Sequence, residues 1–312
     1  MNSTPNNLVP AHLDELLLLL RDTDLETNVD DAASTGDPSD LVAAFGKYFS
    51  ASRESTRAVL GLDIYKYSKY DSDRQRLIPV LFQYLHLQAR TRCIAHERYL
   101  FQNSDLEQSF VPTGDGGFQI LDTPLHALVF AIYFQLHLHA YNASYVFPKL
   151  RRYLGPLTIR YAATYDKIFH LDSNFFGAAI INNARILARD TLNRFLFDSA
   201  SVGWFEERIG SLETLTVFGN DELPLIHELA GYDPSYLDSA VLFPIRRPVK
   251  PLVNSAFRVV AVQKIGTISA KGSELDVYNA YLQVKVTRVL GGGRRKPVIV
   301  TLGNLNTAGI AE

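Results

Sequence analysis

The stretch Ala58-Val59-Leu60-Gly61-Leu62, followed at once by Asp63-Ile64, is an apolar run that predicts a buried strand ending near an aspartate. Apolar residues also flank the turn Pro112-Thr113-Gly114-Asp115-Gly116-Gly117, and this pattern predicts a β-hairpin with Asp115 in its turn. Two carboxylates carried on neighbouring strand ends can hold a pair of hard divalent cations against a triphosphate. The pattern therefore indicates phosphoryl-transfer chemistry.

Taken alone, each aspartate has an ordinary explanation as a turn former. A third segment changes this, because Gly177 is followed eight positions later by Arg185 in Gly177-Ala178-Ala179-Ile180-Ile181-Asn182-Asn183-Ala184-Arg185. With this segment the chain resembles the catalytic domain of class III nucleotidyl cyclases. That family has a strand end of the type D-I-x-G-F-[ST], a G-D turn and a helix start of the type G-x-x-V-N-x-A-x-R. The first motif matches Asp63-Ile64 with Tyr67-Ser68, the second matches Gly114-Asp115, and the third matches Gly177 with Arg185. The order and spacing also agree.

The chain is expected to alternate strands and helices in an α+β fold, with a ferredoxin-like or palm-type cyclase sheet and flanking helices. We expect helices at about 39–57, 74–101 and 123–136, a helix carrying Arg185, and strands at 157–163 and 193–198. The expected parts are an N-terminal helical extension with a linker (1–56), the catalytic domain (57–290) and a C-terminal β tail (291–312).

The resemblance implies a role for each matching residue. Asp63 and Asp115, with the Ile64 carbonyl, would hold two divalent cations, Mn²⁺ or Mg²⁺, and Arg185 would meet the charge that develops on the α-phosphate. A lysine of the last hairpin, Lys271 or Lys264, would grip the triphosphate. The aspartates and the arginine reach one active site from opposite subunits in the family, which implies a homodimer with composite sites.

Departures from the family bear on the substrate. The positions that read the purine edge in adenylyl cyclases hold Val111 and Asn174 here, Tyr67 adds bulk, and the family's asparagine is displaced by one place to Asn182. The chain looks more like the bacterial pyrimidine cyclases of anti-phage defence, which implies UTP as the favoured substrate. An amide offers both a donor and an acceptor, so Asn174 also allows CTP.

Other functions stay open at this point. The chain could be a divergent adenylyl cyclase, a catalytically silent cyclase-like sensor that binds a nucleotide, or a structural protein with a chance pair of aspartates. The presence of Asp63, Asp115 and Arg185 together disfavours the last two. The sequence shows no effector domain, so we expect the receptor of the product to be a separate chain.

Composition agrees with an enzyme that acts on small molecules. The chain has 312 residues, of which 47% are hydrophobic, and can bury a sizeable core. Its net charge of -2 provides no basic surface for a nucleic acid. The leucine run at 16–20 is far too short to span a membrane, so we expect no stable membrane insertion and a cytoplasmic location. Cys93, the single cysteine, is expected to be a buried thiol on a helix.

Overall fold

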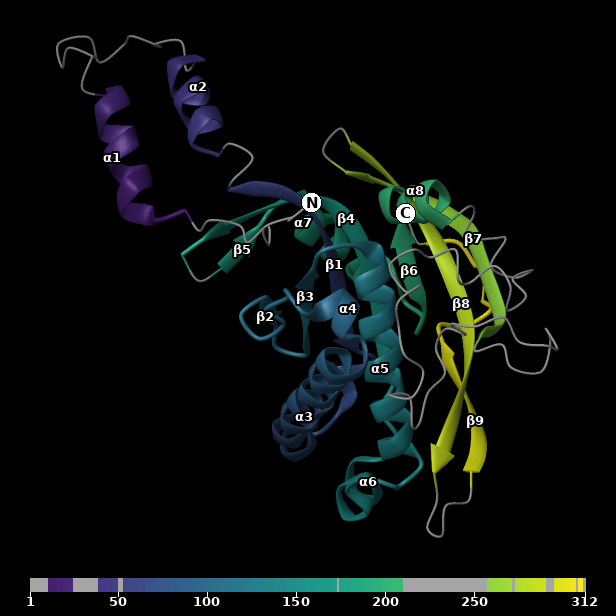
Figure 1. Cartoon of the computed structure of the whole chain (residues 1–312). Coiled ribbons are helices and arrows are strands. Elements are labelled where there is room, and N and C mark those ends of the chain that lie inside the picture. Colours follow the sequence, from purple (N-terminus) through teal and green to yellow (C-terminus); the bar gives the residue numbers. More distant parts are fainter. Residues whose placement is uncertain are drawn as a thin grey trace.

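The computed structural model describes residues 11–24, 39–49, 53–172, 174–209, 257–270, 273–289, 295–306 and 308–310. Two short helices, α1 (Leu13–Asp24) and α2 (Ser39–Tyr48), pack on each other at one end of the molecule (Figure 1). The expected helix at 39–57 is wrong in its second half, because α2 ends at Tyr48 and β1 begins at Glu54. Residues 54–57 instead pair in register with residues 166–169 of β4, and this pairing decides their conformation.

One mixed sheet forms the centre of the described structure. Its order is β2-β3-β1-β4-β6-β8-β7, with β5 paired to β4 and β9 paired to β8. The strands are β1 (Glu54–Ile64), β2 (Phe110–Pro112), β3 (Gly116–Leu121), β4 (Ile159–Leu171), β5 (Asn174–Phe176), β6 (Phe195–Asp198), β7 (Phe257–Ala270), β8 (Ser273–Val289) and β9 (Arg295–Leu302). The first four strands are antiparallel neighbours, whereas β6 is parallel to β4. The unit β1-α3-β2-β3-α5-β4 has the split βαβ order of a ferredoxin-like fold, so the predicted α+β class is confirmed.

The helices cover the sheet on both sides. They are α3 (Ser72–His96), α4 (Arg98–Phe101), α5 (Pro124–Asn142), α6 (Pro148–Leu154), α7 (Ala178–Arg189) and α8 (Ser199–Ile209), together with the short 3₁₀ turn η1 (Tyr67–Lys69). The helix expected at 74–101 is interrupted at Glu97, which ends α3 and begins α4. Cys93 lies buried on α3, as expected. Within the described ranges, no helix is both long enough and apolar enough to cross a membrane.

Side chains of β1 alternate between the two faces of the sheet, as the period of a strand requires. Leu60, Leu62 and Ile64 belong to the main core cluster, which includes residues of α3 and α5. Val59 belongs to a smaller cluster with Ala179 of α7 on the opposite face. Asp63 therefore lies on the α7 face.

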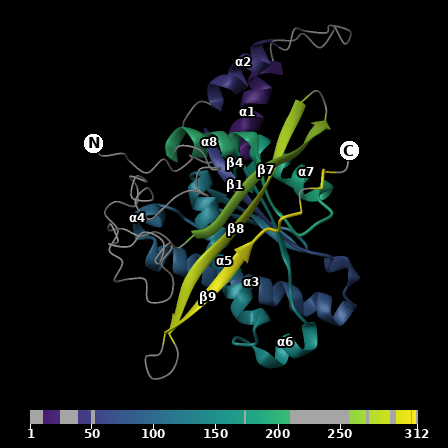
Figure 2. The ribbon, with the colours of Figure 1, turned by 90° about the vertical axis from the view of Figure 1, so that its right-hand side faces the viewer.

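The C-terminal strands continue the sheet beyond β6, and in the turned view they lie toward the viewer (Figure 2). β8 pairs along its length with β7 and then with β9. β9 lies within the segment expected to be a C-terminal tail, and its pairing joins that segment to the common sheet. The proposed domain limits remain a prediction.

Candidate active site

The aspartates Asp63 and Asp115 meet where β1 ends and the β2–β3 hairpin turns. Asp63 lies opposite Gly116 in the β1–β3 ladder, directly beside Asp115, whose carbonyl oxygen accepts a hydrogen bond of 3.0 Å from the amide of Ile64. A Cβ at Gly116 would collide with the carbonyl oxygen of Leu62, so only glycine permits this close approach of the two backbones. The side chains also interact, since Asp115 contributes to a raised pKa of the Asp63 carboxyl.

Arg160, which sequence reasoning did not single out, completes this cluster. It lies opposite Asp63 in the β1–β4 ladder, and its Nε and Nη2 atoms are 2.6 and 2.5 Å from Asp63 Oδ2. Both side chains are largely buried, at 19% exposure for Arg160 and 15% for Asp63. Burial raises the pKa of Asp63 above its ordinary value of 3.8; Arg160 opposes this rise and Asp115 adds to it.

A pocket of about 230 Å³ opens between these strands and α7. Asp63, Asp115 and Arg160 line it, together with Leu62, Thr113, Gly117, Phe118, Ala184, Leu187 and Ala188. The alanines of α7 bring the helix backbone close without filling the space. The pocket therefore combines two carboxylates and one guanidinium with an apolar helix face.

Asn183 holds α7 against the sheet. Its side chain is fully buried, and its Nδ2 donates to the carbonyl oxygens of Val59 and Ala162, each at 2.9 Å. Gly61 faces it, and a Cβ there would collide with Asn183 Oδ1. The pairing of a glycine with a buried amide thus sets the distance between the helix and β1.

The carboxylate pair suits a hard divalent cation. In the described part of the chain no group of three or more His, Cys, Asp and Glu side chains could hold a metal ion. Mg²⁺, however, keeps several waters and binds through one or two carboxylates plus substrate phosphates, and Asp63 with Asp115 provides this donor set. Asp63 is ion-paired with Arg160 in the free chain, so a cation that binds Asp63 Oδ2 would displace this contact. The residues present therefore fit cations that arrive with a nucleotide.

Arg185 lies on α7 but does not line the pocket of its own chain. Its Nη1 atom is 3.3 Å from Asn182 Oδ1, and both side chains are half-buried. The α7 residues that do line the pocket are Ala184, Leu187 and Ala188. The structure brings Asp63 and Asp115 together and leaves Arg185 and Asn182 on another part of the helix surface.

The predicted base-reading residues lie apart from one another. Val111 is half-buried in β2, opposite Phe118, and Asn174 is exposed at the start of β5. Tyr67 packs against the main core, and its hydroxyl donates to the Gln75 carbonyl at 2.8 Å. None of these predicted contacts belongs to the pocket that Asp63 lines.

Of the two lysines predicted to bind the triphosphate, the structure describes only Lys264. Lys271 lies outside the described residues. Lys264 lies on β7 and forms an ion pair with Asp276 at 2.6 Å. Its assignment to a triphosphate stays a prediction.

The fold of this chain is similar to the folds of solved cyclase structures. No protein-family model and no curated protein matches the chain. Its structure is similar to that of an adenylate/guanylate cyclase/hydrolase from Silicibacter pomeroyi, at 15% identity and a TM-score of 0.39 over 73% of this chain and 96% of that one. It is also similar to the adenylyl cyclase CyaB from P. aeruginosa, at 10% identity and a TM-score of 0.38 over 73% and 94% of the two chains.

Proposed function

We propose that the protein is a nucleotidyl cyclase that converts a nucleoside triphosphate to a 3′,5′-cyclic monophosphate and pyrophosphate. The observation that carries the proposal is the meeting of Asp63 and Asp115 at one pocket, on the strand end and hairpin turn where the sequence motifs place them. In this reaction the ribose 3′ oxygen attacks the α-phosphorus, and the bond to the bridging oxygen of the β-phosphate breaks.

Asp63 and Asp115, with the Ile64 carbonyl, are the residues that would hold two divalent cations, Mn²⁺ or Mg²⁺. When bound, such cations lower the pKa of the attacking hydroxyl and neutralise the triphosphate. The protein contributes position and fixed charge. Arg185 would stabilise the charge on the α-phosphate, for which a planar guanidinium is well suited.

Arg160 adds a second guanidinium to the proposed mechanism. In the free chain its Nε and Nη2 atoms contact Asp63. A phosphate oxygen can take the place of that carboxylate, because bidentate donors bind both groups in the same way. Arg160 would then change partner from Asp63 to the triphosphate as the substrate enters.

The position of Arg185 supports a homodimer with composite sites. That side chain does not line the pocket that holds Asp63 and Asp115 in the same chain. A two-fold dimer could bring Arg185 of one subunit to the aspartates of the other, and a two-fold axis would create two such sites. A monomer would then lack part of the machinery.

For the base, we propose a pyrimidine, with UTP favoured and CTP as the second choice. Val111 cannot donate a hydrogen bond to a purine, and Asn174 presents an amide at the exposed start of β5. Tyr67, Asn182 and Lys271 complete the proposed substrate contacts. A cyclic pyrimidine nucleotide made by a cytoplasmic enzyme of this kind would act as a second messenger in antiviral defence, read by a receptor on another chain.

The test is an incubation of the purified protein with each of the four nucleoside triphosphates and Mn²⁺, with products identified by mass spectrometry. Asp115→Ala should make no cyclic nucleotide, whereas Asp73→Ala, which removes an exposed aspartate on α3, should behave as wild type. A preference for ATP would replace the pyrimidine proposal with an adenylyl cyclase. No cyclic product from any triphosphate would refute the cyclase proposal.

A further inference from the structure

The guanidinium of Arg160 has two edges with different partners. Its Nε and Nη2 atoms contact Asp63, and its Nη1 atom donates to the carbonyl oxygens of Leu187, at 3.0 Å, and Asp190. These carbonyls lie at the end of α7, where the last backbone oxygens lack partners within the helix and the helix dipole attracts cations. The end of α7 therefore sets the orientation in which Arg160 faces the pocket.

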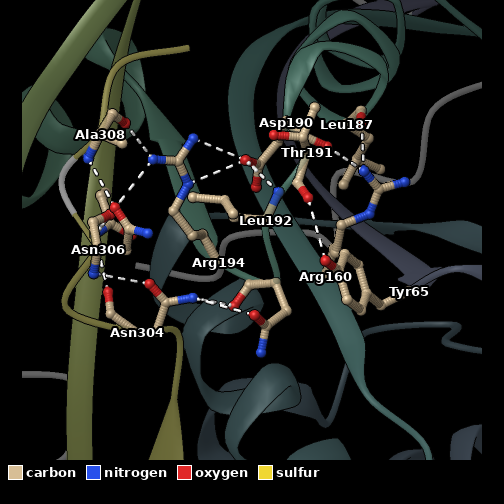
Figure 3. Close-up of polar contacts among 12 residues, drawn as sticks. Tyr65, Arg160, Leu187, Asp190, Thr191, Leu192, Arg194, Asn304, Asn306 and Ala308 are labelled. Atoms are coloured by element: carbon tan, nitrogen blue, oxygen red, sulfur yellow. Dashed lines mark hydrogen bonds and ion pairs between the residues drawn. The ribbon is translucent and has the colours of Figure 1, made fainter. Parts of the chain in front are cut away.

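Asp190 is fixed in turn by Arg194 (Figure 3). Asp190 Oδ1 accepts from Arg194 Nε at 3.0 Å, from Arg194 Nη2 at 2.7 Å and from the amide of Leu192 at 3.1 Å. Both charged side chains are only 1% exposed. Because removing one partner of such a pair leaves a buried charge uncompensated, the contact between Asp190 and Arg194 is costly to break.

Arg194 also binds the chain beyond β9. Its Nη1 atom donates to the carbonyl oxygens of Ala308 at 2.6 Å and Asn306 at 3.4 Å. Asn304 Nδ2 donates to the carbonyl of Asn193 at 2.7 Å, next to Arg194. Figure 3 shows these contacts running from Ala308 through Arg194 to Asp190, with Arg160 beyond.

The backbone supplies a second connection to the same place. The amide of Tyr161, the residue after Arg160, donates to the carbonyl of Arg194 at 3.0 Å. Displacement of Arg194 would therefore act on Arg160 through its own strand as well as through Asp190. Neither Asp190 nor Arg194 lines the pocket, so their action on it is indirect.

We propose that Asp190, Arg194 and the segment of Asn304, Asn306 and Ala308 form a latch that positions Arg160 at the mouth of the active site. The latch holds the Nη1 edge of the guanidinium and leaves the Nε and Nη2 edge for Asp63 or for a triphosphate oxygen. Its consequence for substrate binding rests on the proposed function, whereas its effect on Arg160 does not. Asp190 and Arg194 are thus positioning residues for a group that meets the substrate.

The direct test is ¹⁵N NMR of the Arg160 Nε–H group, assigned by the signal that disappears in Arg160→Lys. Arg194→Lys keeps the buried charge but loses the planar fork, and it should shift or broaden the Arg160 signal. The matched control is Arg189→Lys, at the exposed last residue of α7, and it should leave the signal unchanged. An unchanged Arg160 signal in folded Arg194→Lys would overturn the proposal.

A milder variant covers the case in which Arg194→Lys does not fold. Asn306→Ala removes the 2.9 Å hydrogen bond from the amide of Ala308 to Asn306 Oδ1, and it leaves the Asp190–Arg194 pair intact. It should change the Arg160 signal in the same way but less. No change in this variant would also contradict the latch.

Steady-state kinetics test the functional consequence. Arg194→Lys should raise KM for the triphosphate about fivefold to tenfold and leave kcat within about twofold, because a misplaced Arg160 weakens binding and spares the reacting atoms. A changed Arg160 signal with an unchanged KM would refute the role in substrate binding. If no variant or wild type made a cyclic nucleotide, the cyclase proposal would fail, and the NMR result would still decide the positioning of Arg160.

Discussion

Glu97 lies buried at the junction of α3 and α4, and it offers a quantitative test of the structure. Its side chain accepts a hydrogen bond of 2.8 Å from the hydroxyl of Tyr133, and the residue is only 1% exposed. Burial raises the pKa of its carboxyl from 4.5 to about 7, although the bond from Tyr133 opposes the rise. Between pH 4.5 and about 7, Glu97 therefore keeps its proton in the folded protein and loses it in the unfolded chain.

The sign of the effect follows from this difference. As pH rises from 4.5 to about 7, the unfolded chain loses the Glu97 proton first, so the free energy of unfolding falls; above pH 7 this contribution is flat. Each pH unit between the folded and unfolded pKa values is worth about 1.4 kcal/mol, which gives a cost of about 3 kcal/mol at pH 8. Glu97→Gln, which cannot ionise, should be more stable than wild type by up to that amount, or roughly 2–4 °C in Tm per kcal/mol.

The assay is urea unfolding of wild type and Glu97→Gln at pH 5 and pH 8, with the difference between the two proteins as the measured quantity. The difference is needed because burial lowers the pKa values of His86 and His137 from 6.5 to about 4. These two groups reduce the free energy of unfolding as pH falls, whereas Glu97 reduces it as pH rises. Glu107→Gln is the control, since that side chain is 76% exposed. The reasoning would be refuted if the advantage of Glu97→Gln were the same at both pH values.

Three further predictions concern the site. Mixing inactive Asp63→Ala and Arg185→Ala chains should restore activity, because one site of the mixed dimer keeps both residues; heterodimers without activity would exclude the composite arrangement. Asn174→Ala should bring the turnover of UTP and CTP closer together while leaving the overall rate largely intact, as a competition assay would show; an unchanged preference would remove Asn174 from base reading. Gly61→Ala should cost about 1–3 kcal/mol in urea unfolding, because its Cβ collides with Asn183; wild-type stability would contradict that contact.

Local patterns predicted the parts of the fold that depend on neighbouring residues. The apolar run before Asp63, the glycine-rich turn around Asp115 and the helix after Gly177 all form where the sequence indicates. Asp63 and Asp115 meet because the hairpin packs its second strand directly beside β1.

The pairing of strands that are distant in sequence determines the features that the sequence does not reveal. Arg160 faces Asp63 across 97 residues of sequence, and only the β1–β4 alignment reveals the pair. The same ladder takes residues 54–57 away from the predicted helix. Glu97 separates α3 from α4 with a non-helical backbone (φ −115°, ψ 47°), and its side chain accepts a hydrogen bond from Tyr133 on α5, a contact that the apolar period of the helix does not reveal.

The contact between Gly61 and Asn183 also has an evolutionary consequence. A larger residue at position 61 requires either a shorter residue at 183 or a displaced α7, and the alanines of α7 that line the pocket would move with the helix. A shorter residue at 183 would in turn leave the carbonyls of Val59 and Ala162 without their donor. Substitutions at the two positions should therefore be inherited together, and a lineage could cross from one pair to another only through a less stable intermediate.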